Sequence, residues 1–221
     1  MDDLTTSPQL HAADIGQQNR LLKLSTPLGV DVLLPQRALA YERLGRGYEY
    51  NIDCLSNHEG IELKRLIAQP VTLWVQQADR NYLPVHGYVH TMKRLGSDGQ
   101  FTYCQMSFGP WLHFLKYRKD FRIWQDKTAD EILSDVFSGH PQAQGNFRFE
   151  VREPASKRSY CTQYESDWHF AQRLMEEEGW YSYHEQKGDG SGHVLVVIDS
   201  ADQLQSAAQE AIYFHRGGTQ D

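Results

Sequence analysis

The sequence predicts an α+β fold, mainly antiparallel β, in which a small β-barrel is followed by a mixed helix-and-hairpin domain. Three observations lead to this prediction. Short strand-like runs separated by turn signals continue to residue 108, as in compact barrels. Beyond Pro110 the apolar period becomes helical, and one further hairpin follows. Aromatic residues make up 12% of the chain, which favours pleated, half-buried surfaces.

The predicted barrel consists of short strands interrupted once by a helical segment. The predicted strands are residues 20–25, 30–34, 48–55, 71–76, 85–94 and 101–108. The last two form a hairpin around a glycine-containing turn at residues 96–99. In residues 61–68, Leu63, Leu66 and Ile67 have helical spacing, which predicts a helix there.

The second half carries helix signals. A short helix is expected to begin at Pro110, because proline suits a first helical turn. Thr128 and Glu131 have the spacing of a capping box, which predicts a helix that begins at Thr128. The remaining predicted elements are a helix over residues 167–178, stopped by Gly179, and a hairpin of residues 180–185 and 194–199.

Charge and cysteine usage exclude several classes of protein. The net charge is −7, with 29 acidic and 22 basic residues, and no basic stripe of the kind that binds nucleic acid is evident. Cys54, Cys104 and Cys161 lack the close spacing of a zinc knuckle or a redox motif. We therefore expect free, buried thiols in a protein that folds in the cytosol, with neither metal nor cofactor.

The polarity of the chain also bears on its location. The first twenty residues are polar and lack the apolar region of a signal peptide. No apolar run approaches the ~20 residues that span a bilayer. We therefore expect no stable membrane anchoring and no export by the general secretory route.

Two groups of polar residues are candidate sites. His86 and His90 share a strand face, but roughly 13 Å separates them, so one metal ion cannot join both; we expect surface or barrel-facing histidines. The second group could support acid–base chemistry or bind a metal, although a solvated acidic face explains it more simply. Its members lie on the predicted second helix: His169, Arg173, Glu176 and Glu177.

The remaining candidates also have simpler explanations. Gly188, Gly190 and Gly192 resemble a phosphate loop, but a strand follows them instead of a helix, so a hairpin turn is expected. Ser191 lacks the strand-to-helix elbow that activates a serine. No catalytic, cofactor-binding or metal-binding residue is assigned. Seven aromatics are expected to be mostly core, and to mark an interface if several are exposed together: Trp111, Trp124, Tyr164, Trp168, Trp180, Tyr181 and Tyr183.

Five segments in one order resemble a known family across residues 20–200. They read LLKLSTPLGVDVLLPQRALAYERLGRGYEYNIDCLS, LKRLIAQPVTL, VHGYVHTMKRLGSDGQFTYCQMSFGPWLHFL, RIWQDKTADEIL and YCTQYESDWHFAQRLMEEEGWYSYHE. Together they resemble the VgrG proteins, the spike proteins of type VI secretion systems.

This resemblance implies a barrel of the phage tail hub type and a mechanical role. Family members form a homotrimeric hub that caps the tube of Hcp rings, and they can carry effector or adaptor proteins. The implied parts are a flexible N-terminal arm (1–19), a first hub-like barrel (20–109), a mixed α+β hub domain (110–200) and a segment leading towards a second barrel (201–221). The sequence stops before that second barrel, an OB-fold and a needle would appear, so we expect a fragment or a truncated relative.

Three functions follow as hypotheses. The first is a non-enzymatic structural component, the hub region of a type VI spike, cytoplasmic during assembly and exported by the type VI machinery without a signal peptide. The second is a truncated relative that binds an effector, adaptor or phage-tail protein without forming a tip. The third is a cell-wall hydrolase, which would need paired carboxylates or a Cys/His pair around a groove; no such pair can be nominated.

Overall fold

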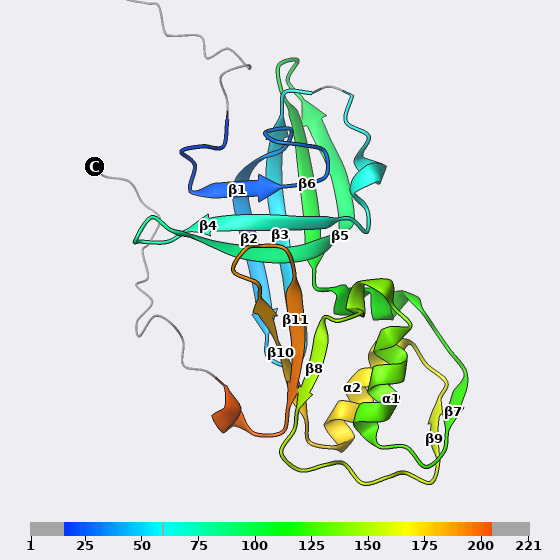
Figure 1. Ribbon diagram of the computed structural model, residues 1–221. Helices are drawn as coiled ribbons and strands as arrows, with labels where there is room; N and C mark the ends of the chain where they lie inside the picture. The colour runs from blue at the N-terminus through cyan, green and yellow to red at the C-terminus, as the bar shows by residue number, and fades with distance from the viewer. Residues whose placement is uncertain (1–15, 59, 205–221) are drawn as a thin grey trace, which may run out of the picture.

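The computed structural model describes residues 16–58 and 60–204, and it confirms the predicted fold class (Figure 1). Two hydrophobic cores form, one from side chains between residues 24 and 108 and the other from side chains between residues 111 and 197. We call residues 22–109 the barrel half and residues 110–204 the α+β half. Most of the predicted N-terminal arm and C-terminal segment lies outside the described residues.

The barrel half is one antiparallel sheet of six strands in the order β1-β4-β5-β6-β3-β2. Its edge strands β1 and β2 approach each other, so the sheet curls around its own core. Alternate residues such as Ile52, Cys54 and Leu73 point into that core, as the period of a half-buried strand requires. The strands are β1 Leu22–Ser25, β2 Leu34–Arg43, β3 Gly47–Ser56, β4 Pro70–Gln76, β5 Tyr82–Ser97 and β6 Thr102–Gly109.

Two predicted elements of this half are corrected. The strand predicted at residues 30–34 is wrong: Val30 is 88% exposed in a turn, and the strand begins at Leu34. Pro35, which directly follows the predicted strand, lies inside β2 beside a register shift, which is where an edge strand tolerates proline. The helix predicted at residues 61–68 is a single 3₁₀ turn, Leu63–Leu66, because β4 begins at residue 70.

The helices of the α+β half pack together on its core. A 3₁₀ helix, Trp111–Tyr117, follows the barrel, as predicted, and is followed by α1 (Ala129–Ser138) and α2 (Asp167–Glu177). The capping box of Thr128 and Glu131 is present at the start of α1. Among the described residues, no helix is long and apolar enough to cross a membrane.

The strands of this half make two small sheets. The hairpin of β10 (Tyr181–Gln186) and β11 (His193–Ile198) is confirmed, and β11 also pairs in parallel with β8 (Phe147–Glu150). A separate pair joins β7 (Arg122–Trp124) to β9 (Cys161–Gln163). Three strands of this half were not predicted: β7, β8 and β9, which have only three or four residues each.

The loop between β10 and β11 contacts the barrel half and so links the two halves. Figure 1 shows the orange hairpin reaching up to the barrel. There the Thr72 hydroxyl of β4 donates to the Gly190 carbonyl over 2.8 Å. A Cβ on Gly190 would lie 2.6 Å from the Trp74 ring, and its φ is +70°, so both space and backbone require glycine. The glycine-rich loop is thus a hairpin turn, as predicted, and packs on the barrel.

Candidate functional site

The two candidate histidines of β5, His86 and His90, do not form a pair, but each contacts a histidine of the α+β half. His86 is 4% exposed, so the expected surface or barrel-facing position is wrong for it; its Nδ1 lies 2.9 Å from Nδ1 of His193. His90 stacks on His113 with ring centroids 4.1 Å apart. His184 packs beside His193, with 5.6 Å between their ring centroids. We call these five residues the histidine seam, because it lies between the halves.

Hydrogen bonds fix the protons at the centre of the seam. The Trp111 amide donates to Nε2 of His193 over 3.1 Å, so neutral His193 carries its proton on Nδ1. That proton is donated to Nδ1 of His86, which leaves the His86 proton on Nε2. Tyr48 completes the contact by donating to the His86 carbonyl over 2.5 Å.

Burial keeps the seam neutral. Burial, assisted by His184, His86 and Lys187, lowers the pKa of His193 to about 2. Burial alone lowers the pKa of His184 to about 3, and its buried Nε2 has no hydrogen-bond partner among the described residues. Burial also lowers the pKa of His113 to about 3, with help from His90 and Lys116. The seam therefore excludes protons and joins the two halves as packed neutral rings.

The four candidate acid–base or metal-binding residues on α2 do not form one site. Ser166 caps the helix by accepting from the His169 amide, and its hydroxyl also meets the His169 ring. Arg173 and Glu177 form an ion pair of 2.8 Å, but Glu176 pairs instead with Arg46 of the barrel half. These contacts indicate a structural role for this helix face.

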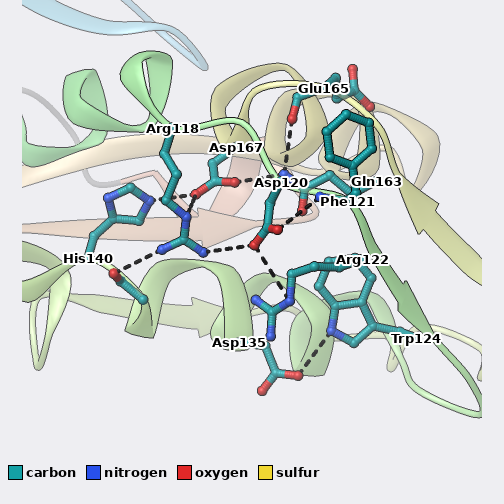
Figure 2. Close-up of polar contacts among 11 residues, drawn as sticks. Arg118, Asp120, Phe121, Arg122, Trp124, Asp135, His140, Gln163, Glu165 and Asp167 are labelled. Carbon is teal, nitrogen blue, oxygen red and sulfur yellow. Dashed lines mark hydrogen bonds and ion pairs between the residues drawn. The ribbon is translucent and has the colours of Figure 1, made fainter.

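A buried ionic cluster, missed in the sequence, surrounds the start of α2 (Figure 2). Asp167 has a fully buried side chain. One carboxylate oxygen accepts from Nε2 of His140 over 2.7 Å and from Nε of Arg118 over 3.0 Å. The other accepts from Gln163 over 2.7 Å. Arg118 also donates to the Gly139 carbonyl, so the cluster links β9 and both helices.

The chemistry of this cluster is that of a structural contact. Burial acts to raise the pKa of Asp167, but hydrogen bonds from His140 and Gln163 and the charge of Arg118 outweigh it and lower the pKa. Both carboxylate oxygens are occupied, and no nucleophile adjoins the His140–Asp167 pair among the residues of Figure 2. Across the described ranges, no group of three or more His, Cys, Asp or Glu residues could hold a metal ion.

The cysteines and the hollow beside β1 offer no reactive group. Cys54, Cys104 and Cys161 are free and buried, and burial raises the pKa of each thiol. A hollow of about 570 Å³ beside β1 has two charged lining residues, and both are engaged. Lys23 lies 4.0 Å over the Tyr82 ring, and Asp31 accepts from the Gln17 amide.

An exposed apolar face covers the β7–β9 pair. Register places Ile123 opposite Thr162 and sends Trp124 and Cys161 to the buried side. The solvent side carries four large side chains that are 57–74% exposed: Phe121, Ile123, Tyr160 and Tyr164. The Phe121 and Tyr164 rings meet edge to face, 5.8 Å apart. Of the seven aromatics singled out above, Tyr164 joins this β7–β9 face, whereas Trp111, Trp124 and Trp180 are core.

Comparison with known proteins identifies relatives for most of the chain. Residues 41–221 match the phage tail baseplate hub (GPD) family. The chain is 34% identical over 200 residues to the type VI secretion system spike protein VgrG1b of Pseudomonas aeruginosa, covering 87% of this chain and 26% of that protein. VgrG1a of the same organism is 34% identical over 187 residues, covering 83% of this chain and 28% of its own length. The chain therefore spans about a quarter of these relatives.

Solved structures share the fold. The Escherichia coli c3393 protein, a type VI secretion component similar to the T4 tail proteins gp27 and gp5, superposes with a TM-score of 0.74 at 21% identity, covering 83% of this chain and 51% of that one. The Francisella PdpA–VgrG complex gives a TM-score of 0.60 at 10% identity, covering 81% and 27%. The chain belongs to the phage tail baseplate hub family, as a relative of the VgrG spike proteins of type VI secretion systems.

Proposed function

We propose that this chain acts as part of a type VI secretion spike, assembling as a trimer that caps the tube of Hcp. The observation that carries the proposal is its 34% identity, over 87% of its length, to a type VI spike protein. The structure supports a mechanical role, because its polar clusters join elements to one another. The proposal includes assembly in the cytoplasm, export by the type VI machinery without a signal peptide, and no reaction.

The β7–β9 face supports assembly. Contiguous exposed aromatic and aliphatic side chains mark protein contacts more often than free surface. We propose that this face contacts another copy or the tube, and that effector or adaptor proteins are further partners. A structural neighbour is a complex of VgrG with PdpA, which supports the second part.

Light scattering tests the assembly. The expected mass is three times the 25.5 kDa of one chain. Replacing Phe121 and Tyr164 together by serine should lower the mass or abolish capture of Hcp. The control variant, Leu83→Ser with Leu95→Ser, removes apolar side chains that are 57% and 59% exposed on the barrel and should change neither the mass nor the capture of Hcp. A folded monomer that does not bind Hcp would refute the proposal and favour a binding module.

A further inference from the structure

The two edges of the barrel sheet differ. At the β1 edge, the side chain of Gln17 hydrogen-bonds to both backbone groups of Leu24. The Leu24 amide donates to Oε1 over 2.5 Å, and Nε2 donates to the Leu24 carbonyl over 3.3 Å. The side-chain amide thus imitates a neighbouring strand. This edge is closed to a further strand, as natural sheets commonly require.

The β2 edge is open over its second half. β2 pairs with β3 on one side. In the described part of the chain, no side chain forms a hydrogen bond with the outward-facing backbone groups of β2 between Ala38 and Glu42. Leu39 and Tyr41 lie on one face of this strand and are 46% and 58% exposed. An open edge with exposed apolar side chains is the form of surface to which extended peptides add.

A basic hollow of about 180 Å³ lies where β2 ends. Arg43 and Lys116 line it, and neither has a carboxylate partner in the part of the chain that the structure describes. Arg46 is already paired with Glu176, and Lys116 lies 4.9 Å over the Trp168 ring. The hollow also contains one carboxylate, that of Glu49. Lys116 also lies 3.4 Å from Nδ1 of His113. Two cations that lack a carboxylate partner, beside aromatic walls, favour an anionic side chain.

We propose that the β2 edge and this hollow bind an extended, acidic segment of a partner protein. The segment adds to β2 through backbone hydrogen bonds, and its alternate side chains lie on Leu39 and Tyr41. Its carboxylate enters the hollow between Arg43 and Lys116. Charge complementarity at the hollow favours an acidic side chain, because Arg43 and Lys116 are cations. The contact must be short-ranged, since the chain as a whole carries a net charge of −7.

A random decapeptide library displayed on phage provides the probe. Selection on the immobilised chain should enrich peptides with β-branched residues and an aspartate or glutamate at one position. In fluorescence anisotropy, a selected peptide should bind the variant Arg43→Gln with Lys116→Gln at least about tenfold more weakly. Changing its acidic residue to the amide should cost a similar factor, and methylating alternate backbone nitrogens should abolish binding.

The matched control is Lys64→Gln with Arg65→Gln, which removes two exposed cations elsewhere and should leave affinity unchanged. Failure to select peptides, peptides without acidic residues, or equal binding to the Arg43/Lys116 variant would each overturn the proposal. So would a fall in the oligomeric mass of that variant, because the edge would then belong to a second copy. The trimer proposal is tested separately by the β7–β9 face.

Discussion

The histidine seam makes the stability of this protein depend on pH. Its histidines have pKa values lowered by burial, to about 2 for His193 and about 3 for His184. In the unfolded chain the same side chains titrate near their ordinary value of about 6.5. Between these values the unfolded state binds protons that the folded state excludes. The stability from each histidine is therefore complete above about pH 6.5 and is lost as the pH falls below it.

The size of the effect follows from linkage. Lowering the pH from about 7.5 to about 5.5 should cost roughly 1–2 kcal/mol for each histidine held neutral. His184 and His193 together should therefore cost about 3 kcal/mol, a large part of the roughly 5–15 kcal/mol that stabilises a typical domain. Lys187 faces the seam and adds to the penalty for protonating His193.

His184→Phe tests this reasoning. The buried Nε2 of His184 has no hydrogen-bond partner among the residues that the structure describes, so phenylalanine removes a titrating group without breaking a hydrogen bond at this atom. At about pH 7.5 the change should cost about 1–3 kcal/mol, since phenylalanine is larger than histidine and the ring packs against Tyr48 and His193. Urea unfolding followed by tryptophan fluorescence should then show that the stability lost between the two pH values is smaller by roughly 1–2 kcal/mol.

The control is His58→Phe, a substitution of an exposed histidine that should leave the pH dependence of the wild type unchanged. If His184→Phe loses as much stability as the wild type between the two pH values, then His184 is not held neutral in the folded protein. That result would refute the argument for the seam.

Two further predictions concern single contacts, and urea unfolding checks both. Asp167→Asn should cost about 2–3 kcal/mol, because it removes the charge of a fully buried carboxylate that Arg118 and His140 contact. Arg118 is 34% exposed and keeps Asp120 as a partner over 3.4 Å. Asp120→Asn, at this partly exposed carboxylate, should cost less than about 1 kcal/mol. Gly190→Ala should cost about 1–3 kcal/mol by overpacking against Trp74, whereas Gly188→Ala, which meets no atom within 4 Å, should change stability by less than about 0.5 kcal/mol. Equal losses within either pair would contradict the contact described.

Much of the fold could be predicted from sequence motifs whose residues lie within a few positions of one another. The capping box of Thr128 and Glu131 and the turn that joins β5 to β6 act over short distances, so the sequence reveals them directly. The strand β2 shows no such signal: residues 34–43 are rich in Ala, Leu, Arg and Glu, and pairing with β3 overrides their helical preference. Strands of three or four residues are too short to show a period.

The polar clusters could not be predicted because their members are distant in sequence. His86 and His193 are separated by 107 positions, and His140 and Asp167 by 27. Each histidine alone resembles an ordinary surface residue. Only the packing of one half on the other brings the rings together and removes their water, and this determines their protonation.

The central position of β11 constrains the order in which the chain can fold. Both β8 and β10 pair with β11, which is the last strand in the described sequence. During synthesis, α1 and α2 emerge before it, and their apolar faces remain without this sheet until residues 193–198 have left the ribosome. The barrel, whose strands end at Gly109, can form earlier. We therefore expect an intermediate with a folded barrel and an incomplete α+β half, which is the stage most exposed to aggregation.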